Sequence, residues 1–268
     1  MINDRNKFVI VFDIDGVICK PPLDSEFILD DPKYIDKFQQ LHPECPDPII
    51  FNYKEELYFH FFPPYLNILF DYLINCNCRI AFFSAGMKAR NIELIEHLLT
   101  NILGNERYQE LKEANQFTVF SKDSLNQEQK KDIAIILNAY EDPNNSVLIE
   151  DQPENATYNT PCILAISLFT WDLWQEDNAS IKCLPKSTVY YLLGVFISYF
   201  NQERIDNITL KDWLEYKKLP NNRDCIENMI KLGLQEVQKQ YHNAIFYGEE
   251  LFTSNKLTNP NPPPTIKF

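Results

Sequence analysis

The chain has 268 residues, of which 45% are hydrophobic, so it is long enough to bury a sizeable core in one domain that carries an appendage. Its net charge of −13 disfavours a nucleic-acid partner, because contacts to phosphates need clustered lysine and arginine side chains. Seven scattered cysteines, a polar start over residues 1–7 without a signal-peptide pattern, and the lack of a membrane-length apolar run together favour a reduced, cytoplasmic setting.

The first predicted element is a buried parallel strand, because residues 8–12 form a run of apolar, mostly β-prone side chains. Asp13 and Asp15 follow it, and strand alternation points both carboxyl groups to one side. In an open α/β sheet, ligand-binding and catalytic residues lie at the carboxyl ends of the strands. Two neighbouring carboxylates need a cation or a raised pKa, and Gly16 permits a sharp turn with positive φ. The alternative is a strand that ends in a plain acidic loop.

An insert of about residues 20–62 separates this strand from the next predicted element. Its first part is polar and rich in proline, and it includes a short helix expected from Asp30 to Gln40. Residues 49–62 alternate in character and carry many aromatic side chains, which predicts a β-hairpin. These aromatic side chains either hold the hairpin against the sheet or form a wall that accepts an aryl phosphate or a peptide.

Strands and helices alternate after the insert, which predicts an α/β fold with a parallel sheet and right-handed connections. Helices are expected over residues 65–75, 88–103 and 127–139, and strands over residues 79–83, 117–120, 146–149 and 162–166. The pattern from residue 186 onward is helical, with a buried helix at 189–200 and with Trp213 and Tyr216 as packing anchors. We expect one domain over residues 1–200, a helical extension over 201–258 and a disordered tail over 259–268.

Polar residues that follow the later strands complete a possible catalytic set. Ser84 follows the strand at 79–83, Lys130 and Lys131 open the expected helix before the strand at 146–149, and Glu150 and Asp151 end that strand. Each also has a purely structural interpretation: Ser84 as a helix cap, the two lysines as a solvated helix face, and Glu150 with Asp151 as a turn. With Asp13 and Asp15, however, they supply what phosphoryl transfer needs: a nucleophile, an acid, a hydroxyl donor, a cation and an acidic ligand for magnesium.

The order of these residues resembles the motifs of the haloacid-dehalogenase (HAD) superfamily of phosphatases over about residues 8–200. Within it, the chain is most similar to the capless branch that acts on the C-terminal domain of RNA polymerase II. Three segments carry that similarity: Phe62-Pro63-Pro64-Tyr65-Leu66, Lys131-Asp132-Ile133 and Ile149-Glu150-Asp151-Gln152-Pro153-Glu154-Asn155. Three features depart from the branch: Asp15-Gly16-Val17, typical of small-molecule phosphatases, Glu150 in place of Asp, and Gln152 in place of Ser.

The resemblance implies a HAD-like, Rossmannoid sheet flanked by helices, with a small insert and a helical C-terminal extension. It makes Asp13 the nucleophile that forms an aspartyl-phosphate, and Asp15 the group that protonates the leaving oxygen and then activates water. It also implies Mg²⁺ held by the carboxylates of Asp13 and Asp151 and by the main-chain carbonyl of Asp15. Phosphate binding is assigned to Ser84, Ala85 and Lys131, with Lys130 and then Lys122 as the alternative lysines.

We therefore predict a magnesium-dependent phosphomonoesterase that acts on a phosphorylated protein or peptide, with phosphotyrosine favoured over phosphoserine because the insert is aromatic. The alternatives are a small-metabolite phosphatase and a catalytically degenerate protein that binds a phosphorylated ligand or a partner. The composition, rich in Asn, Ile and Lys, and the polar tail with Glu249 and Glu250 resemble effector proteins of intracellular bacteria. That likeness predicts translocation into the cytosol of a host cell.

Overall fold

The computed structural model describes residues 8–19, 45–53, 56–60, 62–165, 184–219, 223–242 and 244. The expected helix from Asp30 to Gln40 and the expected tail over 259–268 lie outside the described residues. The side chains of residues 51–59, on which the aromatic wall depends, lie outside them too.

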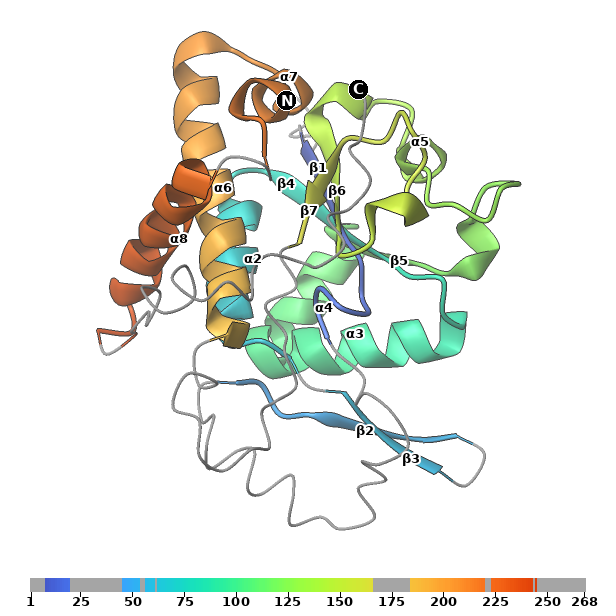
Figure 1. The fold of residues 1–268 in the computed structure, drawn as a ribbon. Helices are drawn as coiled ribbons and strands as arrows, with labels where there is room; N and C mark the ends of the chain where they lie inside the picture. The colour runs from blue at the N-terminus through green and yellow to red at the C-terminus, as the bar shows by residue number, and fades with distance from the viewer. Residues whose placement is uncertain are drawn as a thin grey trace.

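A five-stranded parallel sheet forms the centre of the molecule, with the strand order β5-β4-β1-β6-β7 (Figure 1). The predicted α/β fold with a parallel sheet is therefore confirmed. Phe12 of the central strand is level with Phe82 on one side and Ile149 on the other, so the carboxyl ends of three strands lie side by side. The strands are β1 (Phe8–Phe12), β4 (Cys78–Phe83), β5 (Phe117–Phe120), β6 (Ser146–Glu150) and β7 (Cys162–Leu164).

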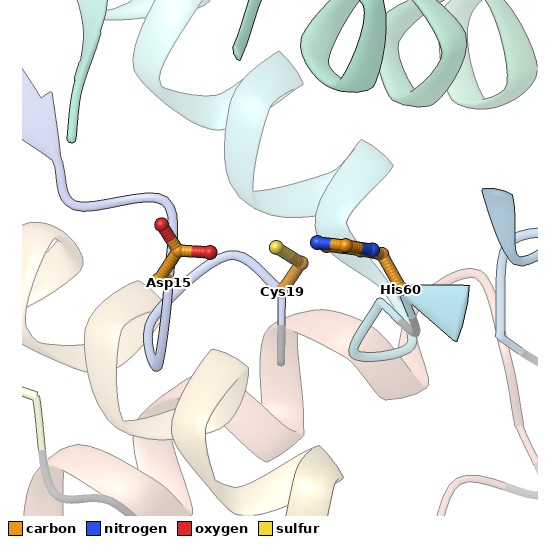
Figure 2. Close-up of side chains that lie close together, drawn as sticks. All are labelled: Asp15, Cys19 and His60. Atoms are coloured by element: carbon orange, nitrogen blue, oxygen red, sulfur yellow. The ribbon is translucent and has the colours of Figure 1, made fainter. Parts of the chain in front are cut away.

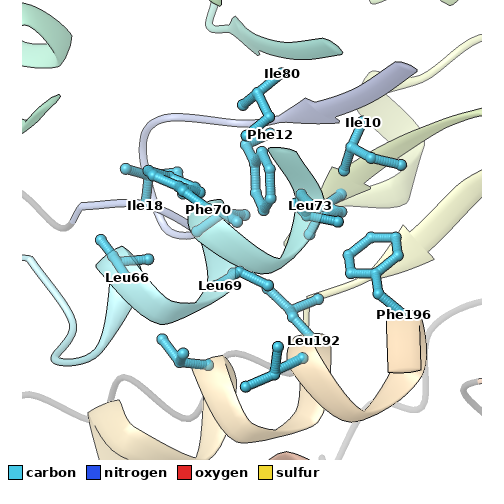
Figure 3. Close-up of a cluster of buried hydrophobic side chains, with 14 of the residues drawn as sticks. Ile10, Phe12, Ile18, Leu66, Leu69, Phe70, Leu73, Ile80, Leu192 and Phe196 are labelled. Carbon is cyan, nitrogen blue, oxygen red and sulfur yellow. The ribbon is translucent and has the colours of Figure 1, made fainter. Parts of the chain in front are cut away.

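Alternate residues of β1 face two different cores. Ile10 and Phe12 point into the larger core, where they meet side chains from α2 and α6 (Figure 3). Val9 and Val11 point into a smaller core on the opposite face, which α5 helps to cover. This alternation is what a strand buried on both faces requires. The helices are α2 (Leu66–Asn75), α3 (Lys88–Leu103), α4 (Asn105–Glu113), α5 (Ile133–Ile136), α6 (Leu184–Asp206), α7 (Leu210–Lys217) and α8 (Arg223–Gln238).

The C-terminal helices pack closely against the larger core. A Cβ atom on Gly194 of α6 would lie 1.7 Å from the Met229 carbonyl oxygen of α8, so this crossing needs a glycine. Trp213 is fully buried, as predicted, but Tyr216 is 74% exposed, so its predicted packing role is wrong. The ammonium group of Lys217 lies 5.4 Å from the centre of the exposed Tyr216 ring. No described helix combines the length and apolar character that a membrane span needs.

The predicted hairpin of the insert is confirmed as a separate antiparallel pair, β2 (Ile49–Tyr53) and β3 (Glu56–His60). It lies apart from the main sheet, beyond α3 (Figure 1). The segment that leads into it touches α3, where the side-chain amide of Asn101 donates a hydrogen bond to Asp47. The insert is thus attached to the helix that follows β4.

The helix expected over residues 127–139 is wrong, since only the single turn of α5 forms there. The side chain of Asn126 accepts hydrogen bonds from two following main-chain N–H groups and so closes a turn in place of the helix start. Lys131 is extended and forms a parallel bridge to Ala156 in the loop after β6. Helical geometry begins only after Asp132, whose carboxylate caps α5. Lys131 is therefore placed by an extended segment beside β6.

Candidate active site

A cavity of about 200 Å³ opens at the carboxyl ends of the central strands. Six residues predicted from separate parts of the sequence line it together: Asp13, Asp15, Ser84, Ala85, Lys131 and Asp151. The structure thus brings these residues to one place: strand register aligns those that follow β1, β4 and β6, and the bridge to Ala156 adds Lys131. The cavity is also lined by Gly86, Leu125, Gln129, Gln152 and Asn155.

Lys131 lies between two buried carboxylates in the wall of this cavity. Its Nζ atom is 2.7 Å from Asp13 Oδ1 and 2.6 Å from Glu150 Oε2. Burial alone would lower the pKa of Lys131, but the charges of the two carboxylates raise it, so the ammonium group stays charged. Burial raises the pKa of Asp13 well above its usual value, and Lys131 opposes that shift. This geometry selects Lys131, over Lys130 and Lys122, as the partner of Asp13.

Three carboxylate groups, from Asp13, Glu150 and Asp151, have oxygen atoms within 4.8 Å of one another. Burial, and next the neighbouring Glu150 carboxylate, raise the pKa of Asp151 to about 6. Gly16 has a φ of 88°, and a Cβ atom there would lie 2.3 Å from Asp151 Oδ2. The positive φ predicted for Gly16 therefore brings the loop after β1 directly against the Asp151 carboxylate. Such an all-oxygen donor set fits a hard divalent cation.

Arg90, on the first turn of α3, is a site residue that the sequence analysis missed. Its guanidinium nitrogens lie 2.8 Å from Asp15 Oδ1 and 2.6 Å from Asp15 Oδ2. The Ser84 hydroxyl donates a third hydrogen bond, 2.8 Å long, to Oδ2. Burial alone would raise the pKa of Asp15, but hydrogen bonds and charge from Arg90, aided by Ser84, lower it. Asp15 is therefore held as a carboxylate whose two oxygens both accept.

Gly86, just before α3, leaves room for the side chain of Arg90. A Cβ atom at Gly86 would lie 2.8 Å from a guanidinium nitrogen of Arg90 and 2.9 Å from Asn91 Oδ1, so a larger residue would force these side chains to shift. The main-chain N–H of Gly86 also donates to the Ser84 hydroxyl over 3.0 Å, which fixes that oxygen. The Ser84-Ala85-Gly86 turn thus lines the cavity and leads directly into α3, which carries Arg90.

Comparison with known proteins gives a likeness of fold. No protein-family model matches the chain, and no curated protein matches it. Among solved structures it is similar to the fission yeast RNA polymerase II CTD phosphatase Fcp1 bound to beryllium fluoride, with 14% identity and a TM-score of 0.44 over 90% of this chain and 68% of that chain. A second structure of Fcp1, described as an essential RNA polymerase II CTD phosphatase, gives 14% identity and a TM-score of 0.43 over 96% and 67%.

Both structures are of an RNA polymerase II CTD phosphatase, the kind of protein whose motifs the sequence resembles. At 14% identity the likeness concerns the fold alone. The residues of the cavity described above are therefore the basis for any activity of this chain.

Proposed function

We propose that this protein is a phosphomonoesterase that transfers a phosphoryl group to Asp13. The observation that supports this best is the position of the Asp13 carboxylate, at the cavity and 2.7 Å from the charged Lys131 Nζ. An Asp13 oxygen attacks phosphorus, the ester P–O bond breaks, and the leaving oxygen departs. Water then attacks the aspartyl-phosphate and restores Asp13. Lys131 offsets the repulsion between the carboxylate and the phosphoryl oxygens, which otherwise opposes attack.

The oxygen donors of the site fit Mg²⁺. The carboxylates of Asp13 and Asp151, which lie in one cluster with Glu150, would hold it. The family resemblance adds the main-chain carbonyl of Asp15 as a third ligand. When bound, the cation supplies charge neutralisation for the phosphoryl oxygens and holds them in place. The chain itself supplies the nucleophile on Asp13 and the ammonium group of Lys131. The Ser84 hydroxyl, which donates to Asp15 in the resting site, would turn to donate to a phosphoryl oxygen.

The size of the cavity supports a phosphorylated protein or peptide as the substrate. At about 200 Å³ it is smaller than the roughly 300–1,000 Å³ of sites that enclose a drug-sized ligand. A phosphoryl group fits inside, and the group that carries it has to lie outside. A small metabolite would then gain few contacts beyond its phosphate, whereas a peptide can contact the surrounding surface.

The contacts of Asp15 support an aryl phosphate, such as phosphotyrosine, over an alkyl phosphate. Both Asp15 oxygens accept hydrogen bonds from Arg90, which favours the ionised form of Asp15 over the protonated acid. In this arrangement Asp15 is a base, suited to take a proton from the water that attacks the aspartyl-phosphate. A phenolate leaves without being protonated, but an alkoxide does not, so the resting site suits aryl leaving groups.

Arg90→Gln tests this preference. Without the guanidinium, the pKa of Asp15 is expected to rise, and a larger fraction of the enzyme carries the proton that an alkyl leaving group needs. We expect the ratio of kcat/KM for an alkyl phosphate to that for an aryl phosphate to rise about 10-fold or more. Activity on the aryl phosphate should also start to fall at a higher pH on acidification, because the base is protonated earlier.

The matched control is Arg107→Gln, which removes an arginine whose partner, Asp71, lies away from the cavity. Neither the substrate ratio nor the pH profile should move in this control. An unchanged ratio in Arg90→Gln would show that Arg90 does not govern the choice of leaving group.

The second test removes the metal. Hydrolysis should stop in chelator and return with Mg²⁺, and Asp151→Ala should raise the Mg²⁺ concentration for half-maximal activity at least about 10-fold. A strand-end carboxylate adds little to the core, so the thermal midpoint should stay close to that of the wild type. Glu154→Ala, which removes an exposed carboxylate in the same loop, is the control and should bind Mg²⁺ normally. Full activity in chelator would contradict the proposed chemistry.

A further inference from the structure

A second group of potential metal ligands lies beside the cavity, formed by Asp15, Cys19 and His60. Figure 2 shows the Cys19 sulfur between the Asp15 carboxylate and the His60 ring, and their ligand atoms all lie within 4.8 Å of one another. Cys19 is 0% exposed and His60 is 3% exposed. Among the described residues that line the cavity, Asp15 is the member of this group that also faces the catalytic site.

The backbone holds Asp15 and Cys19 next to each other in a compact loop. The N–H groups of Ile18 and Cys19 both donate to the Ile14 carbonyl oxygen, over 3.1 and 2.8 Å. The Gly16 N–H donates to the Cys19 carbonyl oxygen over 2.7 Å, which completes a bridge between Asp15 and Cys19. The loop geometry thus fixes two of the three possible ligands before any ion arrives.

The third ligand comes from a different part of the chain. His60 ends β3 and pairs with Ile49 of β2, so the insert hairpin carries its imidazole ring to the loop after β1. A metal ion at this place would tie the insert to the loop that supplies Asp13 and Asp15. This link distinguishes the cluster from the carboxylates of the catalytic site, which come from β1 and β6.

The donor atoms differ in kind from those of the catalytic site. A thiolate, an imidazole and one carboxylate are the ligands of Zn²⁺, which commonly takes three protein ligands and one exchangeable ligand in a tetrahedral site. Mg²⁺ prefers oxygen donors and dehydrates reluctantly, so it should remain with Asp13 and Asp151. On binding Zn²⁺, the Cys19 thiol would release its proton to the buffer. The thiolate and the Asp15 carboxylate would then supply two negative charges, of which the Asp15 charge is shared with Arg90.

We propose that Asp15, Cys19 and His60 form an inhibitory Zn²⁺ site that withdraws Asp15 from catalysis. An Asp15 oxygen bound to Zn²⁺ can no longer serve as the base for the attacking water. It also loses its hydrogen bond from Arg90 or Ser84 at that atom. The metal site stands independently of the phosphatase activity, whereas its inhibitory effect rests on the proposed function.

Cobalt tests the metal site without any reference to activity. Co²⁺ bound to a thiolate gives a near-ultraviolet charge-transfer band that an all-oxygen site cannot give. The wild type, titrated with Co²⁺ in excess Mg²⁺, should show this band with one equivalent, and added Zn²⁺ should abolish it. Cys19→Ser and Cys19→Ala should lack the band, and His60→Gln should need at least about 10-fold more Co²⁺ to show it.

The matched controls are Cys225→Ser and His97→Gln, which alter a cysteine and a histidine outside the cluster and should keep the band. Two Cys19 variants are used because a serine hydroxyl at a buried position can weaken folding, and the thermal midpoint of each reports on this. Absence of the band in the wild type, or its persistence in folded Cys19 variants, would overturn the site.

Inhibition is then measured with an aryl phosphate at saturating Mg²⁺. Zn²⁺ should inhibit the wild type, and the concentration for half inhibition should rise at least about 10-fold in Cys19→Ala and His60→Gln but not in the two controls. Equal inhibition of all variants would place the inhibitory ion on the catalytic carboxylates and refute the inhibitory role. If neither the wild type nor any variant hydrolyses the aryl phosphate but the cobalt band depends on Cys19, the metal site is supported and the proposed function is wrong.

Discussion

Asp13→Asn is expected to abolish turnover, with kcat/KM for an aryl phosphate lowered at least about 10⁴-fold. An amide cannot form the acyl phosphate that carries the phosphoryl group from substrate to water, so the loss removes the reaction path itself. The measurement is the hydrolysis rate at saturating Mg²⁺, together with a single-turnover experiment that traps the phosphorylated protein. The variant should give no trapped phospho-enzyme.

The same substitution should leave the fold intact, which separates loss of chemistry from loss of structure. Asparagine has nearly the shape of aspartate, and the charged Lys131 keeps its contact with Glu150, 2.6 Å away. Little change in the thermal midpoint is therefore expected. Asp123→Asn, which alters an exposed carboxylate in the short 3-10 helix Lys122–Ser124, is the control and should retain full activity. Phospho-enzyme formation by Asp13→Asn would show that another group is the nucleophile.

The fold could be predicted from the sequence where local pattern and burial agree. The apolar run of β1 could only be a buried strand, and the two aspartates after it had to lie at the carboxyl edge of the sheet. Ser84 and Asp151 were placed for the same reason, since each follows a strand whose neighbour is β1. In these cases, recognising the strand from its local sequence is enough to place the side chain that follows it, because the carboxyl ends of neighbouring strands lie together.

The prediction failed where a long-range contact overrides local propensity. The sequence around Lys131 favours a helix, but a bridge to Ala156 holds that residue extended. Propensity is a weak prior against such contacts. Arg90 was missed for a related reason: it lies on the first turn of a helix, where a solvated face is the usual interpretation, and its partner Asp15 is far away in the sequence. Only the folded structure shows that this turn faces the catalytic loop.

Asp15→Asn is expected to differ in kind from Asp13→Asn. The nucleophile and the main-chain carbonyl of residue 15 are both retained, so phosphoryl capture from an aryl phosphate should continue at close to its normal rate. Activation of water should fall by roughly 10²–10⁴-fold, because an amide cannot take the proton. Hydrolysis of the aspartyl-phosphate then becomes the slow step, and phospho-enzyme should accumulate after a burst of released phenol.

A double-mutant cycle with Arg90 decides whether the two residues act together. Arg90 contacts both Asp15 oxygens, at 2.8 and 2.6 Å, so the effects of Arg90→Gln should depend on the Asp15 carboxylate. In the Asp15→Asn background, Arg90→Gln should no longer shift the pH profile or the alkyl-to-aryl ratio. Burst size and trapped phospho-enzyme are measured for all four proteins. Equal losses in the capture and hydrolysis steps of Asp15→Asn, without trapped intermediate, would show that Asp15 serves only to hold the site together.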